Sequence, residues 1–93
     1  IDNYSKAIDN LNLALAKNAN DENALLLIAQ CWFLKVNPEK VNDGNYDEAM
    51  KILETSESYF NRLLELKGKY VKEAGTGLDN IKKRRKEIDP TRW

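Results

Sequence analysis

The stretch of sequence that decides the fold is YSKAIDNLNLALAKNANDENALLLIAQCW, residues 4–32. Its apolar residues recur with the three-to-four-residue period of an amphipathic helix. The period is carried by two related frames: Tyr4, Ala7, Leu11 and Ala14, and then Leu25, Ile28, Ala29 and Trp32. Alanines in such a stripe let two helices approach closely, while larger side chains fill the space between them. The stretch therefore predicts two helices packed against each other.

The first two helices are expected at residues 3–17 and 22–35. Residues 18–20 (Asn-Ala-Asn) separate them, and Asp21 is a suitable N-cap for the second. The second helix is apolar on nearly all of its faces, which is typical of a helix packed between neighbours. We expect Trp32 to pack between the first and third helices and to anchor the core.

The third helix is expected at residues 46–66, after a polar loop over residues 36–45. Asn45 and Glu48 have the spacing of a capping box, which places the first helical residue at Tyr46. Two alignments of its inner face compete, one through Leu53 and Ser56 and the other through Phe60 and Leu63. We favour one long helix, because the two pairs are seven residues, about two turns, apart and share a face. Gly68 is the expected stop.

The fourth helix is expected at residues 69–88. Its apolar stripe is interrupted only by Arg85: Val71, Ala74, Leu78, Ile81, Arg85 and Ile88. Gly75 and Gly77 weaken a helix by about 1 kcal/mol each. They either permit a close helix approach or loosen the first turns. The polar outer face predicts a capping helix at the end of an array.

The frames of residues 4–32 resemble the second helix of one tetratricopeptide (TPR) repeat followed by the first helix of the next. Tyr46 and Ala49 repeat the Tyr4 and Ala7 frame, so the resemblance extends over about residues 4–63. It implies an all-α fold: an antiparallel helix-turn-helix TPR-like solenoid of about four helices with a C-terminal capping helix. Residues 1–93 would form a single domain.

The TPR resemblance also implies a function, a non-enzymatic protein–protein interaction scaffold that binds a peptide or partner helix in a concave groove. Carried onto this sequence, the groove-facing candidates lie on the second and fourth helices: Asn23, Leu26, Leu27, Gln30, Leu34, Lys72, Thr76 and Asp79. Members that bind Hsp70 or Hsp90 clamp a terminal carboxylate with Lys, Asn and Arg. Here the corresponding face carries Leu26, Leu27 and Gln30, which favours an apolar or mixed partner.

Composition argues against catalysis and gives few clues to location. The chain has no histidine, so the commonest general base and nitrogen ligand for metals are missing. The lone Cys31 lies in the most apolar helix and is expected to be a packed, inert thiol. We therefore expect no enzyme, no catalytic residues, no metal and no cofactor.

The chain opens on Ile1 rather than Met, so we expect it to be a fragment or a processed product. No apolar run reaches the ~18 residues of a transmembrane helix. A single cysteine fits a reducing compartment, and the expected location is cytoplasmic.

Charge divides the chain unevenly although the total is zero. Residues 1–68 hold 7 Lys or Arg and 11 Asp or Glu, net −4, whereas residues 69–93 hold 8 and 4, net +4. The excess lies in a basic run: Lys82, Lys83, Arg84, Arg85 and Lys86. The run followed by residues 89–93 (Asp-Pro-Thr-Arg-Trp) is similar to the RNA-binding tail of a TPR-containing subunit family of the signal recognition particle.

Two interpretations of the basic run are open. The first is a solvated cap helix whose cations suit its C-terminal end. The alternative function is binding of RNA or another anionic surface through residues 82–86. We favour the first and expect no nucleic acid partner, because Trp93 alone offers a nearby ring for base stacking. Self-association is also expected, through exposed Ile8 and Leu15 on the first helix.

Overall fold

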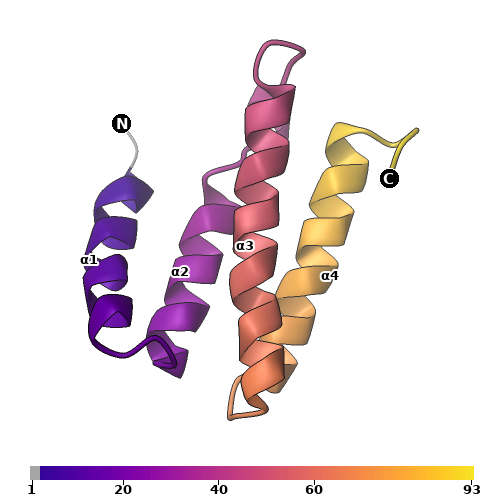
Figure 1. Ribbon diagram of the computed structural model, residues 1–93. Coiled ribbons are helices and arrows are strands. Elements are labelled where there is room, and N and C mark those ends of the chain that lie inside the picture. The colour runs from indigo at the N-terminus through magenta and orange to yellow at the C-terminus, as the bar shows by residue number, and fades with distance from the viewer. Residues whose placement is uncertain (1–2) are drawn as a thin grey trace.

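The computed structural model describes residues 3–93, which form an all-α domain (Figure 1). In chain order the helices are α1 (Asn3–Lys17), α2 (Glu22–Leu34), α3 (Tyr46–Leu66) and α4 (Val71–Ile88). A short 3-10 helix, η1 (Pro38–Lys40), lies in the α2–α3 connection, which was expected to be a simple polar loop. The four helices expected from the sequence are therefore present, with ends shifted by at most two residues.

The helices pack antiparallel in chain order (Figure 1). α3 packs extensively against both α2 and α4, while α2 and α4 touch each other over a much smaller area. α1 contacts α2 and no other helix of the described part of the chain. α3 is thus the central element, and α2 and α4 flank it on either side.

The core is formed where α2, α3 and α4 meet. Its buried members are Leu25, Ala29, Val36, Ala49, Leu53, Phe60, Leu63, Ala74 and Ile81. Both alignments weighed for the third helix are satisfied at once, since Leu53, Ser56, Phe60 and Leu63 are all buried on α3. The Ser56 hydroxyl donates a 2.7 Å hydrogen bond to the Ala29 carbonyl, so the buried polar group is satisfied.

Of the two N-caps expected from the sequence, one is confirmed and one is wrong. Asp21 does cap α2, accepting from the Ala24 amide at 3.1 Å. Asn45, however, makes no capping bond to α3. Its amide side chain instead accepts from the Asn42 amide at 2.7 Å and donates to the Lys40 carbonyl at 3.0 Å. The Asn45 side chain therefore forms hydrogen bonds within the α2–α3 connection and not with α3.

The left-handed residue at the end of α3 is Lys67, with φ 53°, and not Gly68. Gly68 instead lies close to the start of α2. A Cβ atom there would overlap the carboxylate of Glu22 at the start of α2. Gly68 therefore permits a close approach between the α3–α4 turn and α2.

The expected role of Trp32 as the core anchor is wrong. Trp32 is half-buried and lies outside the apolar cluster, with the Lys35 ammonium 5.2 Å from its ring. α1 and α3 do not contact each other, so there is no interface between them in which the indole could be buried. Phe60 and Leu53 of α3 hold the central place instead.

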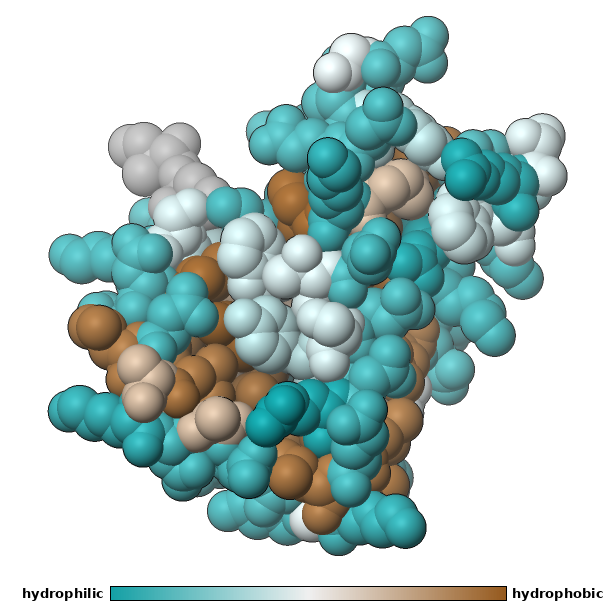
Figure 2. Space-filling model, in the orientation of Figure 1, coloured by the Kyte–Doolittle hydropathy of each residue, from teal (hydrophilic) through white to brown (hydrophobic). Residues whose placement is uncertain are grey.

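The residues expected to drive self-association are not exposed. Ile8 is buried, and Leu15 is half-buried against the core. The large hydrophobic side chains exposed on α1 are Leu13, at 66%, and Tyr4, at 37%. Figure 2 shows apolar residues gathered on the side of the molecule that α1 forms, while the α3 and α4 side is mostly hydrophilic.

Candidate functional site

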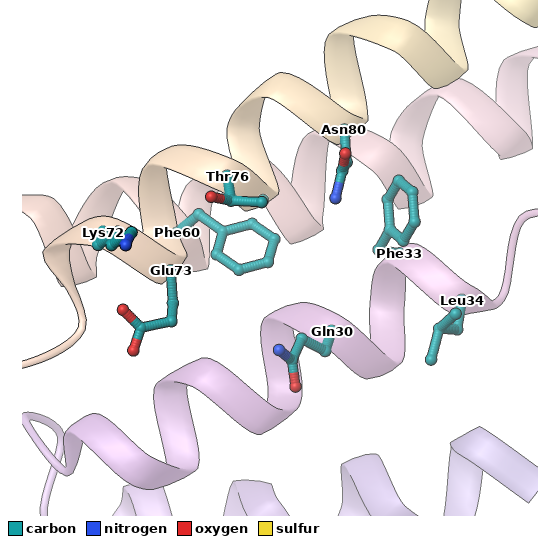
Figure 3. Close-up of a pocket in the computed structure, with 9 residues that line it drawn as sticks. Gln30, Phe33, Leu34, Phe60, Lys72, Glu73, Thr76 and Asn80 are labelled. Carbon is teal, nitrogen blue, oxygen red and sulfur yellow. The ribbon is translucent and has the colours of Figure 1, made fainter.

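An open groove of about 600 Å³ lies between α2 and α4, with α3 behind it (Figure 3). We call it the α2–α4 groove. It is lined by Gln30, Phe33 and Leu34 of α2, Phe60 of α3, and Lys72, Glu73, Thr76, Gly77 and Asn80 of α4. The groove exists because both flanking helices pack on α3 and hardly on each other.

The floor of the groove is the ring of Phe60, which is 3% exposed. The ring lies directly under the backbone of α4 at Gly77, where a Cβ atom would overlap its outer edge. Gly77 therefore allows α4 to lie close to α3, the first of the two roles considered for it from the sequence. A Cβ at Gly75 would meet nothing within 4 Å, so that glycine has no such role.

The two walls differ in character. The α2 wall is largely apolar, with Phe33 and a Leu34 that is 51% exposed. The α4 wall is polar and carries Thr76 and Asn80 one turn apart. In Figure 3, Gln30 and Asn80 point into the space between α2 and α4 from opposite sides. The groove thus combines an apolar strip with neutral hydrogen-bonding groups.

Charge is found at the two ends of the groove. Lys72 and Glu73 lie at one end, near the start of α4. At the other end the guanidinium of Arg84 stacks on Phe33, 4.5 Å from the ring centroid. Arg84 also donates to the Val36 carbonyl and has its Nε 3.8 Å from Glu87. The middle of the groove is uncharged.

Half of the groove residues expected from the sequence line this groove: Gln30, Leu34, Lys72 and Thr76. Asn23 instead accepts a hydrogen bond from the Tyr70 hydroxyl, and Leu26 is half-buried against the core. Leu27 is 51% exposed on α2 but does not line the groove. Asp79 lies in a hollow on the other side of α4.

Five lining residues were not foreseen: Phe33, Phe60, Glu73, Gly77 and Asn80. Two signals for them exist in the sequence. A glycine inside a helix often marks a close approach, which applies to Gly77. Asn80 follows Thr76 by four residues, the other step of the helical period, whereas Asp79 follows it by three.

The basic run does not form one surface, because successive residues of a helix point in different directions. Lys82, Lys83 and Lys86 are exposed, while Arg84 and Arg85 are half-buried. Arg85 forms a bidentate ion pair with Glu57 of α3, with N–O distances of 2.9 and 3.3 Å. Its guanidinium also lies 4.9 Å from the centroid of the Trp93 ring. Arg85, the exception in the α4 stripe, therefore joins α4 to α3.

A second hollow of about 480 Å³ lies beside this ion pair, between α3 and α4. We call it the Trp93 hollow; it is lined by Glu57, Asn61, Leu78, Asp79, Lys82, Arg85, Lys86 and Trp93. The C-terminal segment closes one side of it. There the Tyr46 hydroxyl donates to Asp89 at 2.9 Å, and Trp93 Nε1 donates to the Tyr46 hydroxyl at 3.4 Å.

Within the described part of the chain, two titratable groups have shifted pKa values. The hydrogen bonds from Tyr46 and then Thr91 lower the pKa of Asp89 below its usual range. Burial raises the pKa of the Cys31 thiol, which keeps it protonated at neutral pH. Within residues 3–93, no three His, Cys, Asp or Glu side chains come together as metal ligands. Nor does any helix there have the length and apolar character to cross a bilayer.

No family model matches this chain, and no curated protein or solved structure matches it. The description of this protein therefore rests on its fold and its groove. The chain is an all-α domain of four antiparallel-packed helices with an open, amphipathic groove between α2 and α4.

Proposed function

We propose that this chain is a non-enzymatic protein-interaction module. Its TPR-like row of helices presents the α2–α4 groove to a peptide or helix of a partner protein. The observation that carries the proposal is the apolar strip along the groove, formed by Phe33 and the exposed Leu34 of α2 with the edge of Phe60 behind them. A large apolar side chain of the partner would rest there.

The TPR-like arrangement is supported by the order and packing of the helices. Each helix packs antiparallel on the next, and small residues lie buried at the interfaces: Ala29, Ala49 and Ala74. In a solenoid the first helices of successive repeats line one face. In the proposed TPR-like arrangement α2 and α4 would correspond to these first helices, in support of which both line the same groove, with Phe60 of α3 behind them.

The chemistry of the groove favours binding over catalysis. Its charged lining groups are one ammonium, Lys72, and one adjacent carboxylate, Glu73. Gln30, Thr76 and Asn80 supply neutral donors and acceptors, which suit the amides of a peptide. An apolar centre with a polar rim is the usual composition of a peptide-binding groove.

The test uses a matched pair of variants, Leu34→Asp and Leu27→Asp. Both leucines lie on α2 and are 51% exposed, but only Leu34 lines the groove. Twelve-residue peptides would be selected from a random display library on the unmodified chain and then measured on both variants. We expect Leu34→Asp to weaken binding at least about tenfold, because a carboxylate on the apolar α2 wall would lose its water when the partner's apolar side chain covers it.

Leu27→Asp is expected to leave the affinity within about twofold. Equal loss in the two variants, or none in either, would contradict a function located in the groove. Thermal unfolding of both variants shows whether each keeps the fold.

A second candidate function is binding of an anionic partner at the Trp93 hollow. The observation that favours it is an indole, 41% exposed, beside Lys82 and Lys86. Arg85 and Arg92 already stack on this ring, at 4.9 and 5.4 Å, and so limit the face left for a ligand. The two functions differ in salt dependence, since phosphate binding weakens steeply with salt and apolar groove binding does not.

A further inference from the structure

We propose that the occupant of the α2–α4 groove is an acidic amphipathic helix of about three turns. This inference rests on the proposed function and names the partner that fits the same site. Three properties of the groove carry it: the vacant helix position between α2 and α4, the difference between its walls, and the positive charge along one edge.

The groove is a vacant position for a helix that would pack beside α2, α3 and α4. α2 and α4 both pack on α3 but hardly touch each other, so their outer sides diverge over Phe60. A helix laid between them, opposite α3, would complete a four-helix bundle at the usual interaxial spacing of about 8–10 Å. The lining residues of α4 run from Lys72 to Asn80, which is about 12 Å, or two helical turns.

The two walls match the two faces of an amphipathic helix. Phe33, Leu34 and Phe60 would meet an apolar stripe of residues spaced three and four apart. Thr76 and Asn80 would lie along the boundary with its polar face. This is the helix-in-groove mode of recognition, in which apolar anchors face one wall and polar side chains flank them.

The α4 edge of the groove is positive. Lys72 lies at its start, and exposed Lys83 follows eleven residues later, about three turns on and on the same face of α4. Arg84 adds a guanidinium beside Phe33. The opposing carboxylates are Glu73 beside Lys72, and Glu87, which pairs with Arg84 at 3.8 Å. A partner with acidic residues flanking its apolar stripe complements this edge.

The first arm of the test measures four synthetic peptides by fluorescence anisotropy. Three are fourteen-residue helices with one leucine stripe and with Glu, Gln or Lys in the flanking positions. The fourth is the Glu peptide with a central proline, which breaks the helix. We expect the Glu peptide to bind about tenfold tighter than the Gln peptide, from two exposed charge pairs of about threefold each. The Lys and proline peptides should bind more weakly still.

The second arm moves the same charge change to two places on α4. Lys72→Gln with Lys83→Gln removes the two lysine charges of the groove edge and leaves Arg84, which is paired with Glu87. Lys82→Gln with Lys86→Gln is the matched control, because those lysines line the Trp93 hollow instead. We expect the first double variant to abolish the preference for Glu over Gln peptides and the control to keep it.

The outcomes separate this inference from the proposed function. Equal binding of the Glu and Gln peptides, sensitive to Leu34→Asp, would overturn the acidic partner and keep the groove. Tight binding of the proline peptide would overturn the helix. Loss of the preference in the Lys82 and Lys86 control would assign the acidic groups to the Trp93 hollow. Binding of none of the peptides would overturn both the inference and the proposed groove.

Discussion

The two sides of α4 differ in how completely this chain fills them. Towards α2 the helix faces an open groove with an apolar floor and an uncharged middle. Towards α3 it carries Arg85, whose ion pair with Glu57 and stacking on Trp93 occupy the space. Arg85 and Glu57 on the α3 side are therefore matched within the molecule. The α2 side keeps apolar and hydrogen-bonding groups accessible, and for this reason we place the binding site there.

The largest expected effect comes from exchanging one aromatic ring on each side of α4. Phe60→Ala should lower the free energy of unfolding by about 3–5 kcal/mol, because the ring is buried under Gly77. Trp93→Ala on the other side should cost about 1 kcal/mol, since the indole is 41% exposed and lies outside the buried core. Urea unfolding followed by circular dichroism measures both. Similar costs at the two positions would contradict the difference in packing.

The next largest effect compares two glycines two positions apart on α4. Gly77→Ala should destabilise by about 1–3 kcal/mol, because the new methyl group would press on the Phe60 ring. Gly75→Ala should stabilise by about 0.5–1 kcal/mol, since it gains helix propensity and its Cβ meets nothing. The same unfolding experiment gives both signs. A stabilising Gly77→Ala would mean that α4 does not lie tightly on Phe60.

The smallest effect concerns the C-terminal segment. The pKa of folded Asp89 is lowered because Tyr46 and then Thr91 donate to its carboxylate. The stabilising contribution is therefore present above the unfolded pKa, about 4, and is lost as pH falls through the lowered folded value. Tyr46→Phe should raise the Asp89 pKa towards its usual range and remove this part of the acid dependence.

Carboxyl chemical shifts, followed by NMR through an acid titration, measure the Asp89 pKa directly. Tyr59→Phe is a suitable control, because it removes a hydroxyl from the same helix and leaves the Tyr46 bond intact. An Asp89 pKa that does not respond to Tyr46→Phe would show that the hydrogen bond is not kept in solution.

Much of the fold could be predicted because its signals are local. The apolar periods of residues 4–32 and 46–66 and the breaks at Asn37-Pro38 and Asp89-Pro90 place the four helices closely. The errors at the helix ends arise from non-local or competing contacts. The Asn45 side chain forms its hydrogen bond within its own loop. Gly68 lies close to the carboxylate of Glu22, which is 46 residues earlier in the sequence.

The site was predictable in part, since periodicity tells which helices face each other but not their rotation to within one residue. Of the candidates that the TPR resemblance implied, Gln30, Leu34, Lys72 and Thr76 line the groove, whereas Asp79 lies on the other side of α4 and the neighbouring Asn80 lines the groove. Phe60 was identified as a core residue, but its second role as the groove floor depends on how α4 crosses it. The inward turn of Arg85 depends on Glu57, 28 residues earlier.

The central claim, that the α2–α4 groove is the binding site, is tested most directly by mapping a bound peptide by NMR. The probe is the Glu-flanked leucine helix, titrated into isotopically labelled protein. We predict that the largest amide shifts fall on Gln30, Thr76, Gly77 and Asn80, with contacts from a peptide leucine to the Phe60 ring. Shifts centred on Lys82, Lys86 and Trp93, with the Phe60 region unchanged, would contradict the account.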